Sequence, residues 1–163
     1  MEYQGQELEA FDKAKIFQKY IFLKIKKYFK NGIFEVGAGI GSFTREYIDL
    51  FKDVHLSDLD SSNFNVLKEK YSDRAIKITQ ETIQQTNLNY NTIVYLNVLE
   101  HINKRVLFLK KIIKNSKCKK LLIRVPCFER SWEVPMRKKL KINFYSDDDH
   151  KIEHTIEEFM DEM

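Results

Sequence analysis

A glycine-rich turn directly behind a short apolar run is the feature that most constrains how this chain folds. Residues 33–43 read IFEVGAGIGSF, with a glycine at every second position from 37 to 41. Glycine adopts left-handed backbone conformations without strain and lets another group approach the main chain closely. We therefore expect a strand over residues 33–36, a tight turn that passes close to a bound ligand, and a helix over residues 42–52.

The spacing of these glycines distinguishes between the candidate ligands. A dinucleotide site uses G-x-G-x-x-G, whereas this turn has G-x-G-x-G, and Ser42 stands where the third glycine of the dinucleotide pattern belongs. A P-loop needs a Lys-Ser or Lys-Thr pair behind its glycines, and no such pair closes this turn. The pattern therefore argues against a pyrophosphate cradle.

Helix-like and strand-like segments alternate along the chain. From residue 6 to residue 30 apolar residues recur at steps of three and four, which predicts one amphipathic helix that ends at Asn31 and Gly32. Behind the glycine turn, we expect strands at residues 53–58, 75–79, 91–99 and 118–127, and helices at residues 61–71 and 104–116. This order predicts an α/β fold with a doubly wound, mostly parallel sheet of about five strands, helices on both faces, and a ligand at the carboxyl ends of the strands.

Two helix starts carry capping signals. Ser61 or Ser62 is expected to cap the helix over residues 61–71. Thr155 and Glu158 have the T-x-x-E spacing of a capping box, so a final helix should begin there.

Length and composition indicate one soluble domain. With 163 residues and 43% hydrophobic content, the chain can bury one substantial core. The net charge is +4, but the basic residues are dispersed, and the densest stretch, residues 24–30, also reads as the polar face of a helix, which argues against nucleic-acid binding. Cys118 and Cys127 belong to no zinc-ligand motif. Since no apolar run approaches the roughly 18 residues of a membrane span and no signal peptide is evident, we expect a cytoplasmic protein.

Three motifs stand in order along the chain: EVGAGIGSFT at residues 35–44, VHLSDLD at residues 54–60 and YLNVLEHI at residues 95–102. Together they resemble the class I S-adenosylmethionine-dependent methyltransferases, whose fold is Rossmann-like. The resemblance covers most of the chain, from residue 10 to residue 127. It implies a single methyltransferase-like domain over residues 1–163, with a helical segment (1–32), a cofactor-binding core (33–127) and an acceptor-side or edge-covering tail (128–163).

The resemblance implies where S-adenosylmethionine binds. Its methionine part would lie over the glycine turn, whose matching residues are Gly37, Ala38, Gly39 and Gly41. Glu35 would orient the ammonium group of the cofactor, because a carboxylate is the natural partner of that charge. The other reading is an ordinary strand glutamate; we favour the functional one, since a charge inside an apolar strand is costly without a partner.

Contacts to the nucleoside part are implied at the end of the second strand. Asp58 lies 21 residues after Gly37 and matches the acid that accepts the ribose hydroxyls, for which an offset of about 20 residues is expected. Leu59 would then pack on the adenine, and Asp60 would begin the capping turn of the next helix.

Two further segments are compared with the family pattern. At the end of strand 91–99, Asn97 and Val98 would approach the cofactor, with residues 99–101 on the following turn. Behind the third strand the family places an acid for the adenine amino group, but here Thr82 holds that position and Glu81 stands one position early.

The chain also stops before the antiparallel hairpin that the family adds beside strand five. We therefore expect a fold truncated at its C-terminal end, with an exposed edge at residues 121–125. The tail could fold over this edge, or a second copy of the chain or a partner protein could pair there; a natural or engineered truncation is the third reading.

No catalytic base is singled out. A sulfonium methyl group is already activated, so transfer needs an aligned nucleophile and, for a hydroxyl or amine, removal of a proton. The candidate bases are Glu100, His101, His150 and His154. The last two stand among acidic residues, which could suggest a metal site, but a solvated acidic loop before a capped helix explains them better, and no metal is predicted.

The tail also holds the candidate acceptor contacts, namely Phe128, Arg130, Trp132, Arg137 and Tyr145, although Trp132 could equally be a core anchor. This mixture would suit a polar or anionic small molecule.

The leading hypothesis is transfer of a methyl group to a small-molecule or a sugar- or lipid-linked acceptor, with S-adenosylhomocysteine as product. The alternative is a catalytically inactive, truncated cofactor-binding fold that acts as a partner subunit or regulator. A nicotinamide-dependent oxidoreductase is disfavoured by Ser42 and by the motif at residues 97–102, and base methylation by the absence of an Asn-Pro-Pro-Tyr signature.

Overall fold

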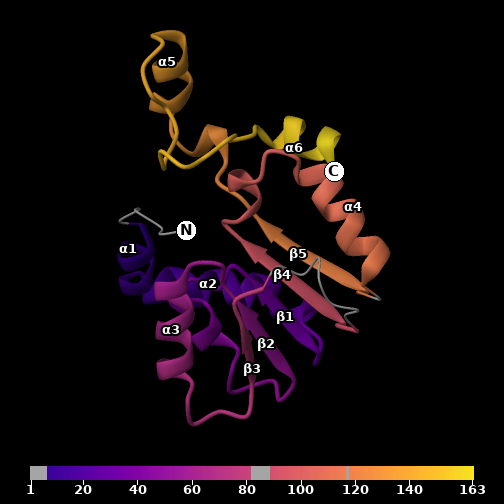
Figure 1. Ribbon diagram of the computed structural model, residues 1–163. Helices are drawn as coiled ribbons and strands as arrows, with labels where there is room; N and C mark the ends of the chain where they lie inside the picture. Colours follow the sequence, from indigo (N-terminus) through magenta and orange to yellow (C-terminus); the bar gives the residue numbers. More distant parts are fainter. Residues whose placement is uncertain (1–6, 82–88, 117) are drawn as a thin grey trace.

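The computed structural model describes residues 7–81, 89–116 and 118–163, which form a five-stranded sheet flanked by helices (Figure 1). The strands are β1 Ile33–Val36, β2 Val54–Ser57, β3 Lys77–Thr79, β4 Thr92–Leu96 and β5 Lys120–Arg124. Their order is β3-β2-β1-β4-β5 and every neighbouring pair is parallel, so all carboxyl ends lie at one edge. The predicted α/β fold is confirmed.

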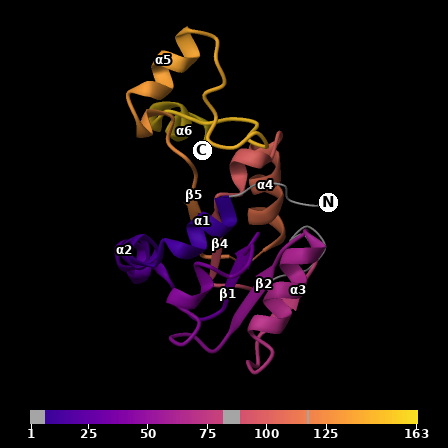
Figure 2. The ribbon, with the colours of Figure 1, turned by 90° about the vertical axis from the view of Figure 1, so that its left-hand side faces the viewer.

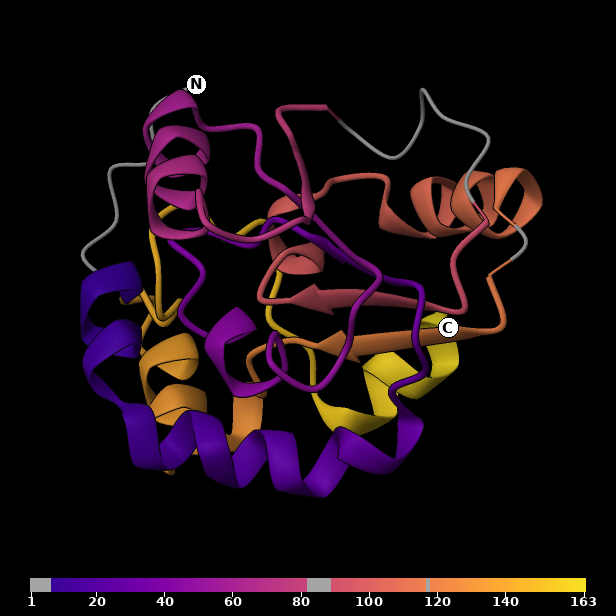
Figure 3. The same ribbon diagram turned by 90° about the horizontal axis from the view of Figure 1, so that it is seen from below.

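Alternate strand residues point into two separate cores. Ile33 and Val94 belong to the core that also holds side chains of helices α2 (Lys15–Ile25) and α3 (Ser61–Lys70). Phe34 and Ile93 belong to the core under α4 (Arg105–Asn115). Figure 3 shows α4 and α2 on opposite sides of β4 and β5. Because both faces are covered, every residue of β1 is buried.

The N-terminal segment forms two helices, so the prediction of a single helix over residues 6–30 is wrong. α1 (Glu7–Lys13) ends at Ala14, whose φ of −80° and ψ of 50° are not helical, and the 3₁₀ helix η1 (Lys26–Tyr28) follows α2. The break turns α1 onto the glycine turn, where Asp12 accepts a hydrogen bond from Ser42 at 2.8 Å and forms an ion pair with Arg45 at 3.2 Å. These tertiary contacts outweigh the preference for one continuous helix that the apolar periodicity indicates.

The helix predicted over residues 42–52 is also wrong. The segment is a series of turns with one short 3₁₀ helix, η2 (Thr44–Glu46). Ser42, Phe43 and Thr44 are buried in succession. A surface helix buries only one face, so three consecutive buried residues require an irregular path.

α3 begins where expected, but its cap is Asp60 and not Ser61 or Ser62. The Asp60 carboxylate accepts hydrogen bonds from the backbone N–H groups of Ser62 at 2.8 Å and Asn63 at 3.0 Å. These are donors that a helix leaves unsatisfied in its first turn. The prediction that Asp60 begins the capping turn is therefore confirmed.

The tail crosses the carboxyl edge of the sheet. After η5 (Phe128–Arg130) it forms α5 (Glu133–Lys139), which the sequence did not predict and which stands apart from the sheet in Figures 1 and 2. It returns to the end of β5, where the N–H of Phe128 donates to the carbonyl of His154 at 2.8 Å. It ends with α6 (Ile156–Glu162), which begins at the predicted capping box of Thr155 and Glu158. Among the described residues, β5 pairs with β4 alone.

The helices of the described ranges are short. α2 and α4, the longest of them, have 11 residues each. None of these helices has the length and apolar character that crossing a membrane requires.

Candidate functional site

The glycine turn lies at the carboxyl edge of the sheet, between β1 and the end of β2. Gly37, Gly39 and Gly41 have φ values of 69°, 56° and 69°, a left-handed conformation that favours glycine. The backbone N–H groups of Gly37 and Ala38 donate to the carbonyl of Ser57 at 2.8 and 2.9 Å. The turn is thus fastened to the last residue of β2.

All three of these glycines are also approached closely by other segments, and a Cβ on Gly41 would lie 2.9 Å from Cε2 of Tyr71 in the turn after α3. A Cβ on Gly37 would lie 2.7 Å from Cγ2 of Val98, and one on Gly39 would lie 2.9 Å from Cδ2 of Leu8. The turn after β4 and helix α1 therefore both contact the glycine turn. The contact of Leu8 was missed, because one apolar position in an amphipathic helix gives no sign of its partner.

Asp58 follows β2 directly, and its carboxylate faces the glycine turn. Oδ2 accepts the backbone N–H of Gly39 at 2.7 Å, and Oδ1 accepts that of Asp60 at 2.9 Å. Burial raises the pKa of the Asp58 carboxyl, and these hydrogen bonds oppose the rise. Asp58 is 9% exposed, whereas the neighbouring Leu59 is 54% exposed. Since a carboxylate oxygen has two lone pairs, Oδ2 keeps acceptor capacity for a ligand hydroxyl.

Glu35 is buried within β1 and is bonded to the segment behind the glycine turn. The hydroxyls of Thr44 and Tyr47 donate to its Oε2 at 2.6 and 2.5 Å. Burial raises the pKa of Glu35 to about 7, although both hydrogen bonds lower it. The protein itself thus supplies partners for the buried carboxyl, and its burial alone is no argument for contact with a ligand.

Asn97 follows β4 in a left-handed conformation, with a φ of 56°. Its N–H donates to the carbonyl of Arg124 at 2.9 Å, and its Oδ1 accepts a hydrogen bond from the Arg124 guanidinium. Arg124 ends β5 and was missed by the sequence reasoning. The available signal was a charged residue at the carboxyl end of an apolar strand, where a parallel sheet places its ligands.

The structure brings most of the predicted cofactor residues to one place. Gly37, Gly39, Asp58 and Val98 are linked by the contacts above, and Asn97 adjoins Val98. Thr82, expected near the adenine, lies outside the described residues.

Residues 34–117 match a sequence family described as a methyltransferase domain. The chain belongs to the class I S-adenosylmethionine-dependent methyltransferases. No curated protein sequence matches this methyltransferase chain.

Solved structures share the fold of this chain at low sequence identity. Magnesium protoporphyrin IX methyltransferase from Synechocystis, with bound S-adenosylhomocysteine, has a TM-score of 0.66 and 12% identity over 99% of this chain and 77% of that one. A putative methyltransferase from Bacillus halodurans has a TM-score of 0.67 and 14% identity over 88% of this chain and 65% of that one. A methyltransferase from Clostridium acetobutylicum has a TM-score of 0.57 and 14% identity over 69% of this chain. The match spans only half of that chain, 50% of its length.

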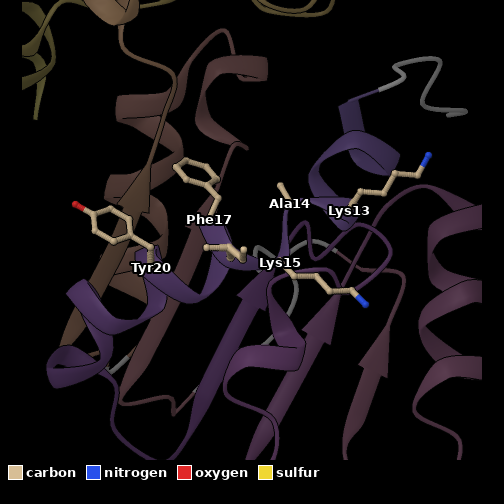
Figure 4. A pocket seen from close by; sticks show the side chains of 6 residues that line it. Lys13, Ala14, Lys15, Phe17 and Tyr20 are labelled. Carbon is tan, nitrogen blue, oxygen red and sulfur yellow. The ribbon is translucent and has the colours of Figure 1, made fainter.

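A surface hollow of about 540 Å³ lies at the junction of α1 and α2 (Figure 4). It is lined by Lys13, Ala14, Lys15, Ile16, Phe17 and Tyr20. The guanidinium of Arg124 lies 5.5 Å from the centre of the Phe17 ring, which links the hollow to the end of β5. Sequence reasoning missed this hollow, because it depends on the break at Ala14.

The candidate acceptor contacts of the tail divide into buried and exposed side chains. Phe128 is buried, and Arg130 donates to Glu153 and to the carbonyl of Phe144. Trp132 is 74% exposed, so its reading as a core anchor is wrong. Tyr145 stacks on Phe144 with a distance of 4.5 Å between ring centres, and Arg137 donates to the carbonyl of Asn143.

The two histidines of the tail are not in a solvated loop, contrary to the sequence interpretation. His150 and His154 are each 5% exposed. His154 Nε2 lies 2.5 Å from Glu162 Oε2 and 3.2 Å from the Arg105 guanidinium. His150 lies against the turn after β4, where Lys151 donates its N–H to the carbonyl of Glu100 at 2.8 Å. The acidic residues before His150 hid this burial in the sequence.

Proposed function

We propose that this chain binds S-adenosylmethionine at the carboxyl ends of β1, β2 and β4 and transfers its methyl group to a small-molecule or a sugar- or lipid-linked acceptor. The observation that carries the proposal is the meeting of three segments at one edge of the sheet. The glycine turn contacts Val98 through Gly37 and Asp58 through Gly39. A ligand at this edge would contact all three segments at once.

The residues present fit this cofactor. The glycine turn offers backbone without side chains to the methionine part, as the left-handed φ of Gly37 and Gly39 indicates. Asp58 is placed to accept ribose hydroxyls through Oδ2, and the exposed Leu59 to pack on the adenine. We assign the remaining cofactor contacts to Glu35, Ala38, Gly41, Thr82, Asn97 and Val98.

When bound, S-adenosylmethionine supplies a methyl group on a positively charged sulfur. The protein then has to align the acceptor and keep water out, and for a hydroxyl or amine acceptor it must also remove a proton. Burial lowers the pKa of His101, which lies on the turn after β4, so its ring is neutral at neutral pH and able to accept a proton. We leave the choice of base open among this ring, Glu100, His150 and His154.

The hollow beside α2 is our candidate acceptor site. Phe17 and Tyr20 offer aromatic surface, whereas the ammonium groups of Lys13 and Lys15 point away from these two rings (Figure 4). This lining suits an acceptor with an apolar or aromatic body.

A second candidate function is cofactor binding without catalysis, in a partner subunit or regulator. The observation in its favour is that β5 pairs with β4 alone among the described residues, which leaves its other edge for a second copy of the chain or another protein. Both functions require cofactor binding, but only the enzyme forms S-adenosylhomocysteine when it is offered pools of acceptors.

The decisive experiment is calorimetric titration with S-adenosylmethionine, S-adenosylhomocysteine and NAD. We expect the wild type to bind the first two, Asp58→Ala to lose at least about tenfold in affinity, and Asp73→Ala to bind as the wild type does. Asp73 is a matched control, because its side chain is 79% exposed. Binding of NAD without S-adenosylmethionine would overturn the proposal.

A further inference from the structure

We propose that Glu100, His101 and His150 form a binding site for a divalent transition-metal ion. Each of the three offers one ligand atom, and these atoms all lie within 4.8 Å of one another. Two imidazoles and a carboxylate are the donor set that zinc, iron, cobalt and manganese accept in proteins. This proposal does not rest on the proposed methyl transfer, because it depends only on the packing of the tail against the sheet. An ion bound there would remove Glu100, His101 and His150 from the candidate bases.

The three residues come from two distant segments that the fold brings together. Glu100 and His101 belong to the 3₁₀ helix η4 (Leu99–His101), directly after β4, whereas His150 belongs to the tail. The N–H of Lys151 donates to the carbonyl of Glu100 at 2.8 Å, which fastens the tail beside η4. The rings of His101 and His150 then lie 4.9 Å apart.

The orientation of His150 suits a metal ligand. Its Nδ1 lies 2.9 Å from Oε1 of Glu153, so this nitrogen carries the proton and donates it to the carboxylate. Its Nε2 faces Glu100, with 4.0 Å between Nε2 and Oε1. That distance is too long for a hydrogen bond. Two ligands about 2.0–2.2 Å from one tetrahedral ion lie about 3.4 Å apart, so binding of an ion would draw these two side chains slightly closer together.

His150 has the kind of supporting partner that metal sites commonly use. Glu153 is itself held by the Ser146 hydroxyl, which donates to it at 2.7 Å, and by Arg130. Carboxylates and carbonyls in this position fix the tautomer and the direction of a ligating ring.

Burial gives the site one closed and one open side. Glu100 is 2% exposed and His150 is 5% exposed, whereas His101 is half-buried. A divalent ion would compensate the charge of the buried Glu100 carboxylate. Three protein ligands leave a further coordination position, which water or an oxygen ligand would fill on the side of His101.

The test uses the full chain without a polyhistidine tag, since such a tag binds the same ions. After treatment with a chelator and its removal, the protein is titrated with Zn²⁺, Mn²⁺ and Co²⁺ in separate calorimetric experiments. We expect one ion per chain for at least one of these metals. Bound Co²⁺ should also give visible absorption bands that report nitrogen and oxygen ligands.

Three variants locate the ion. We expect Glu100→Gln and His101→Asn each to weaken binding at least about 100-fold, and Glu153→Gln about 10–100-fold, as loss of a supporting partner does. Glu157→Gln, at an exposed position of α6, should bind as the wild type does. Circular dichroism checks that each variant is folded. If Glu100→Gln fails to fold because Glu100 is buried, His101→Asn still tests the proposal, since His101 is only half-buried.

Two results would overturn the proposal. Absence of binding for all three ions would leave His150 as a hydrogen-bond partner of Glu153 within the tail. Binding that persists unchanged in Glu100→Gln and His101→Asn would place the ion elsewhere on the chain.

Discussion

The carboxylate of Asp58 accepts the backbone N–H of Gly39 at 2.7 Å, which joins the end of β2 to the glycine turn across 19 positions of sequence. A buried N–H that loses a charged acceptor costs about 1.5–3 kcal/mol. We expect Asp58→Ala to lower the free energy of unfolding by about this amount, besides weakening cofactor binding. Urea denaturation measures the loss, and Asp73→Ala, on the surface, should change stability by less than about 0.5 kcal/mol. An Asp58→Ala variant as stable as the wild type would contradict the role of this hydrogen bond.

Gly37 is predicted to tolerate no side chain, for two separable reasons. Alanine would have to adopt a φ of 69° and would place its Cβ 2.7 Å from Val98 Cγ2. We expect Gly37→Ala to cost about 1–2 kcal/mol for the backbone and about 1–3 kcal/mol more for the clash. Adding Val98→Ala should remove only the second part, which a double-mutant cycle by urea denaturation measures. Strictly additive losses would show that Val98 does not press on this position.

Glu35 should make stability depend on pH. Burial raises its pKa from 4.5 to about 7 in the folded protein. The folded state therefore binds more protons than the unfolded state between these values, and the stability that the neutral carboxyl provides, complete below pH 4.5, is lost as the pH rises through 7. Glu35→Gln cannot ionise and keeps an oxygen to accept from Thr44 and Tyr47. The stability of this variant relative to the wild type should increase between pH 4.5 and 7 and then level off; a constant difference would contradict the assignment.

His55 should make stability depend on pH in the direction opposite to that of Glu35. Its ring stacks on Phe34 with 4.1 Å between centres and contacts the Tyr90 hydroxyl at 2.5 Å. Burial lowers its pKa from 6.5 to about 4, so the unfolded state binds more protons in this range and stability falls as the pH drops from 6.5 towards 4. Observation of the ring resonances by NMR should give a titration midpoint near 4 for the folded protein. A midpoint near that of free histidine would show that the ring is accessible to water.

The phenylalanine that lines the hollow provides a test of the acceptor site. Phe17 is 47% exposed, so Phe17→Ala should leave the fold and the affinity for S-adenosylmethionine unchanged while lowering turnover at least about tenfold for an acceptor identified by screening. Leu107→Ala, at an exposed position of α4 with 56% exposure, is the control and should leave both unchanged. Equal turnover in the two variants would place the acceptor elsewhere.

The elements that position the site could be read from the sequence where apolar periodicity and local motifs agree. β1, β2 and β4 are short runs of buried residues. The turn after β1 is marked by glycines because its backbone is left-handed at these positions. The capping box of Thr155 and Glu158 is a local interaction between residues three positions apart. Such features depend on neighbours in sequence, so the sequence predicts them.

The features that were missed depend on contacts between distant residues. The break at Ala14 accompanies the ion pair of Asp12 with Arg45 across 33 positions, and the burial of His150 depends on η4. The irregular path after Gly41 depends on Glu35 of β1, which accepts hydrogen bonds from the hydroxyls of Thr44 and Tyr47. No periodicity encodes these pairs, because each member is an ordinary polar residue until the fold brings its partner near.

The return of the tail to its starting point has a consequence for how such a chain diversifies. The N–H of Phe128 and the carbonyl of His154 meet at 2.8 Å, so α5 lies on an excursion whose two ends are already joined. Because the entropy of closing a loop grows only slowly with its length, this excursion can be lengthened, shortened or exchanged while β5 and the glycine turn stay in place. Its ends therefore mark points at which the segment that carries α5 can be replaced without rebuilding the sheet.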